Sequence, residues 1–443
     1  MLNISFKGCV PPYFIGSTKI TPIAKNPSPN DIEKAIRTVQ KEPCIGSGLN
    51  GDAFFMGQDL VVKKYLNPEA AKREISILDG MYDRGVIIPN AQQGMYAFSG
   101  PEGDYLVSTR INGKTPNCIT NPFNTANMTS LVNSLYRMDK LKQIKDNAIQ
   151  DESDEYFPYY VVMHYDLHDG NINITDKEGG ILDFEFLNYY HLSQNMMRQK
   201  EGPQNACDCN FSDIPGITSN LRGFEYRTLS PYLFDMQKKC PEKIDKFFTD
   251  YLKIKSEYHY KREHDFMMEA REGGKSSELN WELAEKEHAH AEMLRKPTPE
   301  VIAAEKIKIQ MADFIFTQSE FEGFIGRRIN KKQIEEYVNK AKGFFYKKAE
   351  ESSKNKNERL YWEDCAQLMR NWSDVINWMD WQDTKLDLEY FNWNNIPEEE
   401  RTEDYKKSMQ VHYEHHMQNY ELFNKKKSDK YQPVLFDINT LKF

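Results

Sequence analysis

Three oxygen-bearing side chains in the middle of the chain are spaced so that they could act on one substrate. Asp166 and Asn171 lie five residues apart in a histidine-led segment, and Asp183 follows twelve residues later, near the end of an apolar run. A carboxylate can orient a substrate hydroxyl and accept its proton. Amide and carboxylate oxygens are ligands that Mg²⁺ prefers. The spacing therefore predicts Asp166 as the catalytic carboxylate and Asn171 and Asp183 as ligands of Mg²⁺.

A lysine upstream of these residues could neutralise a phosphate. The run Leu60-Val61-Val62-Lys63-Lys64-Tyr65 has the composition of a strand. Because alternate residues of a strand share a face, Val61 and Lys63 would lie together, Val61 against an adenine and Lys63 on the phosphates. Lys64 would point the other way and is the minor alternative. An edge strand with two solvated lysines is the structural alternative.

Glu74 follows Lys63 by eleven residues, within a stretch that Asn67-Pro68 begins as a helix. A carboxylate on that helix could hold the lysine extended toward a nucleotide. Taken alone, an exposed helical glutamate would be the preferred interpretation. The neighbouring motifs favour a catalytic ion pair between Lys63 and Glu74.

A glycine-rich segment precedes the lysine strand. Gly46, Ser47, Gly48 and Gly51 belong to a G-x-G-x-x-G pattern that leads directly into a strand. A dinucleotide-binding turn would need a strand before the glycines and a helix after them, which is the opposite order. A glycine-rich hairpin fits better, since its backbone can approach phosphates closely. A surface turn is the alternative if the segment is taken alone.

Together these residues predict transfer of a phosphoryl group from ATP, with Mg²⁺ as cofactor. Such a reaction has a loose transition state, so neutralisation of charge and in-line positioning contribute most of the catalysis. Each motif by itself is a weak signal. Their joint occurrence in the expected order makes a chance origin improbable.

The sequence resembles the protein-kinase-like superfamily, and within it the aminoglycoside phosphotransferase and choline kinase branch. The run 166–171 is similar to the D-L-H-x-G-N loop of that branch, and Asp183-Phe184-Glu185 to its D-F-E. The resemblance covers about residues 44–190. It implies an α+β, protein-kinase-like bilobal fold with a small β-rich N-lobe and a mainly helical C-lobe. It also implies a hinge in which Thr109 and Ile111 give backbone hydrogen bonds to adenine.

One departure from the protein-kinase pattern bears on the substrate. No A-P-E element follows Asp183 closely, and the nearest imitation, 226–232, comes late and lacks the glutamate. We therefore expect a small-molecule hydroxyl acceptor. The alternatives are a protein kinase with a divergent activation segment and a catalytically silent kinase-like scaffold whose helical tail binds a protein partner.

The strands and helices expected around these residues divide the chain into four predicted domains. Short strands are expected at 53–56, 60–65, 105–111, 159–163 and 181–184, and helices at 31–41, with Asn30 as N-cap, 68–81 and 128–142. The domains are a loosely attached lead-in with a helix (1–43), a kinase-like N-lobe (44–113), a C-lobe core with the catalytic and metal-binding loops (114–235), and an additional helical substrate or accessory region (236–443).

The aromatic residues near the C-terminus allow two interpretations. Five of the six tryptophans lie between Trp362 and Trp393, and apolar residues from Tyr361 to Met379 recur at helical spacing. A cage for a cationic acceptor is one interpretation, and the core of a helical bundle is the favoured one. A net negative charge would also suit a cationic acceptor.

Composition narrows the class of protein. The 443 residues include 58 Lys and Arg against 67 Asp and Glu, a formal charge of −9 that disfavours nucleic acid as a partner. Seven scattered cysteines predict free thiols in a reducing compartment. Neither a signal peptide nor an apolar run of about 20 residues is evident, so we expect a cytoplasmic protein without a membrane span.

Overall fold

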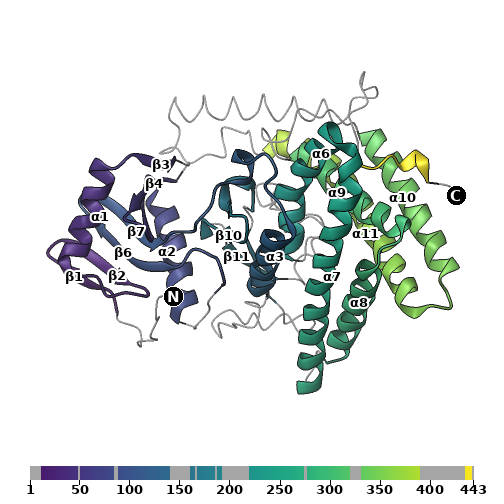
Figure 1. The fold of residues 1–443 in the computed structure, drawn as a ribbon, viewed down its shortest axis with the longest axis horizontal. Helices are drawn as coiled ribbons and strands as arrows, with labels where there is room; N and C mark the ends of the chain where they lie inside the picture. The colour runs from purple at the N-terminus through teal and green to yellow at the C-terminus, as the bar shows by residue number, and fades with distance from the viewer. Residues whose placement is uncertain are drawn as a thin grey trace. The chain divides into compact units, whose positions relative to one another are not determined.

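A computed structural model describes most of the chain as two compact units (Figure 1). The first unit comprises Met1–Asp151 and Tyr160–Tyr190, and the second Glu152–Tyr159 and His191–Phe443. An antiparallel sheet dominates the first unit and helices the second, so the chain has a mixed α/β fold. The boundary expected at residue 113 falls inside the first unit. The described residues are 11–47, 50–83, 88–139, 160–164, 167–184, 187–191, 219–273, 277–319, 331–389 and 435–441.

A seven-stranded antiparallel sheet forms the centre of the first unit. Its strands lie in the order β1-β2-β6-β7-β5-β4-β3. In the β4–β5 pair, Ala53 faces Lys63 and Phe55 faces Val61. The strands are β1 (Tyr13–Ile15), β2 (Thr18–Pro22), β3 (Cys44–Ser47), β4 (Gly51–Met56), β5 (Leu60–Tyr65), β6 (Gly94–Gly100) and β7 (Gly103–Thr109).

The N-terminal segment is more tightly integrated than expected. Strand β2 pairs with β6, and β1 pairs with β2, so residues 13–22 extend the sheet rather than form a loose lead-in. Neither β1, β2 nor β6 was predicted. Strand β2 pairs with β6 about 75 residues away, which local composition does not record. The β1–β2 and β6–β7 pairs are hairpins, and the composition of such short strands is a weak signal.

Helix α1 (Pro29–Lys41) packs on one face of the sheet. Ile32 and Ala35 lie in the apolar core with Phe54 and Val62. The prediction of Asn30 as N-cap is wrong: Ser28 caps the helix, its side chain accepting from the Asp31 N–H while Asp31 accepts from the Ser28 N–H. The reciprocal pair satisfies two donors at once, which favours the earlier start.

Helix α2 (Pro68–Asp83) packs on the opposite face of the sheet from α1. Glu74 of α2 contacts Lys63, whereas α1 contacts Val62, and adjacent strand residues point to opposite faces. The predicted strand at 60–65 and the helix beginning at Pro68 are confirmed.

The rest of the first unit carries the loops with the polar motifs. The predicted strand at 181–184 is wrong in its bounds, because the strand ends at Ile181 and Asp183 takes a left-handed conformation with φ 58°. Strands β9 and β10 form a hairpin, and β8 pairs with β11. The elements are η1 (Pro116–Cys118), α3 (Thr125–Asp139), β8 (Tyr160–His164), η4 (Asp169–Asn171), β9 (Ile172–Ile174), β10 (Gly179–Ile181) and β11 (Leu187–His191).

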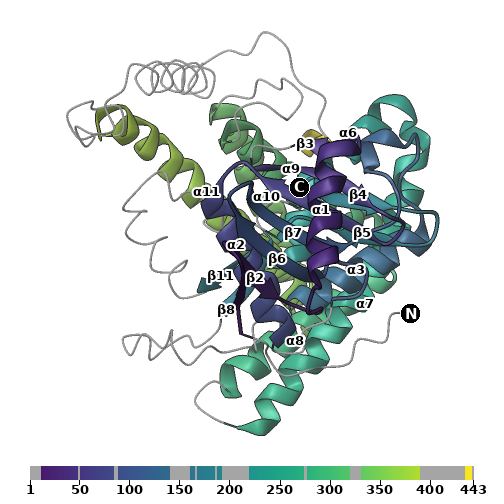
Figure 2. The same cartoon turned by 90° about the vertical axis from the view of Figure 1, so that its left-hand side faces the viewer.

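The described part of the second unit is helical, as expected. Helices α7 and α8 lie side by side along their lengths (Figures 1 and 2). The helices are α5 (Asn220–Phe224), α6 (Ser230–Lys239), α7 (Pro241–Glu272), α8 (Ser277–Arg295), α9 (Pro299–Ser319), α10 (Lys331–Glu351) and α11 (Lys356–Glu389), with a π-helical turn, η8 (Glu225–Leu229), after α5 and a 3-10 turn, η11 (Ile438–Thr440).

The predicted apolar stripe of α11 is buried from Tyr361 to Ile376, and the side chain of Met379 lies outside the described residues. Tyr361, Met369 and Trp372 are fully buried, and the Trp362 ring stacks on Phe345 with centroids 5.9 Å apart. Core packing therefore accounts for these two tryptophans. The side chains of the tryptophans beyond them lie outside the described residues.

The centre of the helical unit also holds charged groups. The Lys255 ammonium lies 2.6 Å from Glu225 Oε1 and 2.9 Å from Glu305 Oε2, and all three residues are buried. Tyr251 donates to Glu225 and Tyr361 to Glu305. A buried charge is tolerated when it is paired and hydrogen-bonded, as each of these is.

Two further sequence expectations concern cysteines and membranes. Cys44, Cys118, Cys240 and Cys365 are free thiols. Within the described ranges, every helix is too short or too polar to span a bilayer.

Candidate functional site

The Lys63 ammonium lies between two carboxylates that are far apart in sequence. Its Nζ is 2.8 Å from Glu74 Oε2 and 2.9 Å from Asp183 Oδ1. The Lys63 side chain is only 15% exposed. Burial alone would lower the pKa of Lys63, but Glu74 and Asp183 outweigh it and hold that pKa above its ordinary value. The ammonium is therefore charged, oriented and still partly open to solvent.

Alternation along β5 distinguishes the two lysines. Lys63 contacts α2, whereas Lys64 Nζ lies 5.9 Å from the centroid of the Tyr105 ring, within the group of residues that faces α1. The predicted pairing of Lys63 with Glu74 is present. Val61 shares the Lys63 face, as the strand geometry requires.

Glu74 is completely buried and uses both carboxylate oxygens. Oε2 accepts from Lys63 Nζ and from the Tyr65 hydroxyl at 2.7 Å, and Oε1 accepts from Gln92 Nε2 at 3.3 Å. Burial raises the pKa of Glu74, while the Lys63 ammonium and the Tyr65 hydroxyl oppose that rise. Three donors around one buried carboxylate compensate much of its lost hydration.

Asp183 has an unusual backbone that directs its side chain toward Lys63. Its φ of 58° lies in the left-handed region, which residues other than glycine adopt only at a cost in free energy. Its N–H donates to Gln92 Oε1 at 3.0 Å. Strained backbone of this kind persists where surrounding contacts hold it, and it is concentrated at functional sites.

A backbone hydrogen bond joins Asn171 to the segment that carries Asp183. The Leu182 N–H donates to the Asn171 carbonyl at 2.9 Å, and the Asn171 N–H donates to the His168 carbonyl at 3.0 Å. The two predicted metal ligands thus project from adjoining segments. Their amide and carboxylate oxygens fit Mg²⁺, which commonly takes one or two protein ligands beside waters and phosphate oxygens. No group of three or more His, Cys, Asp or Glu that could hold a metal occurs among the described residues.

The loop predicted to be catalytic is partly described. Asp166 lies outside the described residues, so its predicted role is untested by the structure. On its N-terminal side, His164 Nε2 lies 2.9 Å from the Leu182 carbonyl. On its C-terminal side, Leu167 is fully buried and the Gly170 N–H donates to His168 Nδ1 at 2.9 Å. Both flanks of the loop are therefore fixed to the Asp183 segment or to the core.

The predicted phosphate-binding glycines differ in their surroundings. A side chain at Gly46 would meet nothing within 4 Å, whereas a Cβ at Gly51 would lie 2.6 Å from the Lys64 carbonyl oxygen. Ser47 Oγ donates to Asp52 Oδ1 at 2.6 Å, and Gly48 lies outside the described residues. Close approach of β4 to β5 thus explains Gly51, and open space surrounds Gly46.

The predicted adenine hinge is only partly available. The Thr109 N–H already donates to the Gln93 carbonyl at 2.8 Å, and Thr109 Oγ1 accepts from the Gln93 N–H. The Ile111 carbonyl accepts from Asn173 Nδ2 at 3.0 Å. Strand β7 ends at Thr109 rather than at Ile111, because the chain leaves the sheet there and Lys114 pairs with Ile174.

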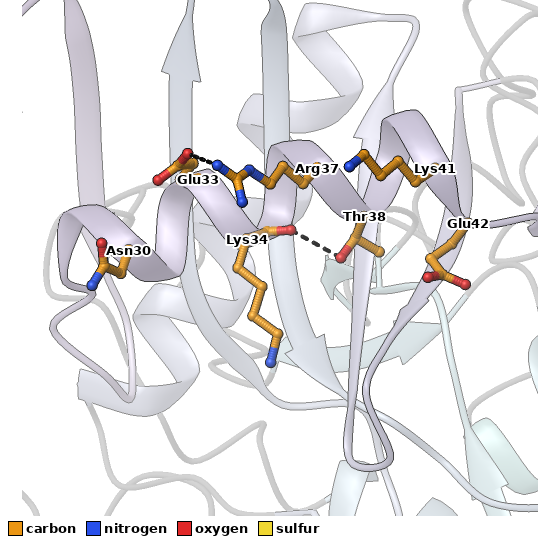
Figure 3. A pocket seen from close by; sticks show the side chains of 7 residues that line it. All are labelled: Asn30, Glu33, Lys34, Arg37, Thr38, Lys41 and Glu42. Atoms are coloured by element: carbon orange, nitrogen blue, oxygen red, sulfur yellow. Dashed lines mark hydrogen bonds and ion pairs between the residues drawn. The ribbon is translucent and has the colours of Figure 1, made fainter.

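A hollow of about 350 Å³ lies along α1 (Figure 3). Its lining carries charges of both signs, and Glu33 pairs with Arg37 across one turn of the helix. The predicted site residues are not among the residues that line it, which are Asn30, Glu33, Lys34, Arg37, Thr38, Lys41 and Glu42.

Comparison with known proteins gives only distant similarities. Neither a protein-family model nor a curated protein sequence matches the chain. Among solved structures, the chain is similar to a ternary complex of APH(2")-IIa with streptomycin and ATP, at 12% identity and a TM-score of 0.27 over 37% of this chain and 74% of that one. It is also similar to a gentamicin complex of APH(2")-IIa, with 12% sequence identity and a TM-score of 0.28. That match covers 62% of this chain and 98% of the other. Similarities of this size settle neither the fold nor the substrate.

Two side chains that the sequence did not single out complete the site. Tyr65 lies two residues after Lys63 on the same face of β5, so strand periodicity alone could have indicated it. Gln92 belongs to a segment with no motif, and no sequence signal pointed to it. Both donate to Glu74.

Proposed function

We propose that the chain is an ATP-dependent phosphotransferase that transfers the γ-phosphate of ATP to a hydroxyl of a small molecule. The observation that carries this proposal is the placement of Lys63 between Glu74 and Asp183, residues 11 and 120 positions away in sequence. An amine held by one buried carboxylate and directed toward a second, more exposed one suits binding of a phosphate–metal complex. In this proposal the fold is the bilobal, protein-kinase-like one.

Each predicted site residue of the first unit would have its own role in the reaction. Lys63 would bind phosphate oxygens, and Glu74 would keep its ammonium extended. Asn171 and Asp183 would hold Mg²⁺, which supplies neutralisation of the charge on the phosphates. Asp166 would orient the acceptor hydroxyl and accept its proton.

The nucleotide would lie against the face of β5 that carries Val61. Because the Thr109 N–H is committed to Gln93, an adenine would have to use the Thr109 carbonyl instead. Gly46 and Ser47 of β3, with Gly48, would approach the phosphates. Gly51 has a packing role in addition, since β5 leaves no room for a side chain there.

A small-molecule acceptor is favoured by the D-L-H-D-G-N and D-F-E runs and by the lack of an A-P-E sequence soon after Asp183. A cationic acceptor would suit the net charge of the chain, although Trp362 and Trp372 are buried in the core and do not support an aromatic cage.

The test begins with thermal unfolding of the full chain in the presence of ATP, with and without Mg²⁺. A ligand that binds the folded state raises the melting temperature, and we expect the larger rise with both. ATP consumption is then measured against amino alcohols, aminoglycosides, sugars and nucleosides, and radiolabelled ATP is used with generic protein substrates.

The matched variant is Asp166→Asn, which should lose most turnover and retain affinity for Mg²⁺-ATP. Failure of ATP to stabilise the wild-type protein would favour a catalytically silent scaffold. Strong labelling of proteins, with no small molecule phosphorylated above background, would favour a protein kinase.

A further inference from the structure

Gln92 is a buried side-chain amide that joins three parts of the candidate site. Its Nε2 donates to Glu74 Oε1 at 3.3 Å and to Ser108 Oγ at 3.2 Å, and its Oε1 accepts from the Asp183 N–H at 3.0 Å. The residue precedes β6 and is 8% exposed. One amide therefore contacts α2, β7 and the Asp183 segment together.

The partners themselves fix the orientation of this amide. The Asp183 group that contacts Gln92 is the backbone N–H, which can only donate, so the oxygen of Gln92 must face it. The Glu74 carboxylate in its ionised form offers only acceptors, so the NH₂ group must face it. If the amide were reversed, its NH₂ group would face the Asp183 N–H, which is also a donor. Its oxygen would face the Glu74 carboxylate, which is also an acceptor.

The side-chain amide of Gln92 extends a series of backbone hydrogen bonds between residues 90–92 and the segment 181–183. The Ile181 N–H donates to the Asn90 carbonyl at 3.0 Å, and the Gln92 N–H donates to the Ile181 carbonyl at 2.9 Å. These bonds accompany a parallel bridge between Ala91 and Ile181. At Asp183 the backbone turns into the left-handed region, and the Gln92 side chain supplies the acceptor for its N–H.

We propose that Gln92 is a positioning residue that holds Asp183 in its left-handed conformation and Glu74 in its rotamer, so that both carboxylates meet Lys63. This inference rests on the proposed function, because Asp183 and Glu74 matter there as a metal ligand and a lysine partner. Gln92 would act through these two residues and would not contact the phosphates. Residues that orient a metal ligand commonly affect metal affinity by about 10- to 100-fold.

The variant is Gln92→Leu, which keeps the bulk of the side chain and removes both hydrogen-bonding functions. Its matched control is Asn127→Leu. Asn127 is also a buried amide of the first unit, and its Nδ2 donates to the carbonyls of Pro122 and Thr175 at 2.8 and 3.0 Å. Both substitutions remove buried hydrogen bonds, but only Gln92→Leu removes contacts to Glu74 and Asp183.

Two measurements on the full chain distinguish positioning from general stability. The first is hydrogen exchange of the Asp183 amide without nucleotide, which we expect to accelerate by about tenfold or more in Gln92→Leu and to stay unchanged in Asn127→Leu at matched global stability. The second is the Mg²⁺ dependence of ATP affinity, which should weaken by about tenfold or more in Gln92→Leu alone. Gln92→Glu keeps an acceptor for Asp183 and should restore protection of that amide more than Gln92→Leu does.

The two measurements separate the two proposals. Equal Asp183 exchange in Gln92→Leu and Asn127→Leu would overturn the positioning role whatever the protein binds. Faster exchange of Asp183 with unchanged Mg²⁺ dependence would also overturn it, since Asp183 would then be released without effect on the metal. Absence of ATP binding in the wild-type protein would reject the proposed function, and the exchange result would still decide whether Gln92 holds Asp183.

Discussion

At the scale of single residues, the candidate site depends on how one ammonium is shared. Lys63 contacts the fully buried Glu74 and the more exposed Asp183, whose side chain is 32% accessible. The inner carboxylate is surrounded by donors, whereas the outer one remains reachable from solvent. This asymmetry suits an inner residue that orients the lysine and an outer one that meets a ligand.

Lys63→Met should reduce ATP affinity and turnover far more than Lys64→Met, on the order of 100-fold for the loss of a preorganised charged donor. The variant should also lose stability, since an unpaired buried carboxylate costs roughly 3–5 kcal/mol. Calorimetric ATP titration and urea unfolding measure the two effects. A larger loss of ATP affinity in Lys64→Met would show that the opposite face of β5 binds the nucleotide.

Asp183→Asn should weaken Mg²⁺-dependent ATP binding by at least about tenfold, which corresponds to roughly 1.4 kcal/mol. The reason is that a formal negative charge toward the metal disappears while the shape of the side chain is kept. Titration of Mg²⁺ at fixed ATP measures the change. Asp176→Asn, which removes an exposed charge of the same unit, is the control and should bind as the wild type does. Wild-type Mg²⁺ dependence in Asp183→Asn would reject the metal-ligand role.

At the scale of elements, the β3–β4–β5 hairpins and α2 bring the site residues together. Strand β5 directs Lys63 to the α2 face, and α2 presents Glu74 to it. The β4–β5 pairing is tight at Gly51, where the Lys64 carbonyl leaves no space for a Cβ. Packing therefore requires a glycine at Gly51 of β4, whereas it sets no such requirement at Gly46 of β3.

Gly51→Ala should destabilise the first unit by about 1–3 kcal/mol, because the added methyl group would force β4 away from β5. Gly46→Ala is the matched substitution and should leave stability unchanged, since nothing lies within 4 Å of its Cβ position. Chemical unfolding measures both. If Gly46 approaches phosphates as proposed, Gly46→Ala should weaken ATP binding without loss of stability. Equal stability of the two variants would contradict the packing explanation.

At the scale of the whole molecule, the two units have different interiors. The α1 face of the sheet encloses an apolar core, and the Lys63–Glu74 pair lies on its α2 face. The helical bundle buries Lys255 with Glu225 and Glu305, and also the two histidines His259 and His290. His259 Nδ1 lies 2.6 Å from Glu287 Oε2, and Arg262 Nε lies 2.7 Å from Glu287 Oε1. The His259 ring stacks on His290 with centroids 5.1 Å apart. Such a core makes the stability of the bundle sensitive to acid.

Stability of the bundle should fall as the pH falls from about 6.5 toward 4. Burial lowers the pKa of His259 from 6.5 to about 4 against the pull of Glu287, so the unfolded chain takes up a proton in this window before the folded one does. This contribution is fully present above the unfolded pKa and decreases by up to about 1.4 kcal/mol per pH unit below it.

Urea unfolding of the wild type and of His259→Asn across this pH window measures how steeply the free energy of unfolding changes with pH. The asparagine can still donate to Glu287 but does not titrate, so its slope should be shallower. The exposed His264 on the same helix provides the control, and His264→Asn should keep the wild-type slope. Identical slopes for all three proteins would show that His259 does not contribute.

Features that depend on neighbours along the chain were predictable. The alternation of β5 placed Val61 and Lys63 together, and the helical spacing from Tyr361 to Trp372 identified the buried face of α11. The start of α2 followed from Asn67-Pro68. In these segments the period of the backbone decides which side chains share a face, so a short stretch of sequence contains the information.

Features that depend on contacts between distant segments were decided only by the tertiary structure. Strand β2 pairs with β6 across about 75 residues of chain, and β1 joins the sheet by pairing with β2. The Asp183 residue has a left-handed backbone, and its N–H donates to the Gln92 side chain, 91 positions away in sequence. Local sequence could indicate that Lys63, Glu74 and Asp183 have suitable chemistry. The free energy that brings them together comes from non-local burial and pairing, which no local pattern records.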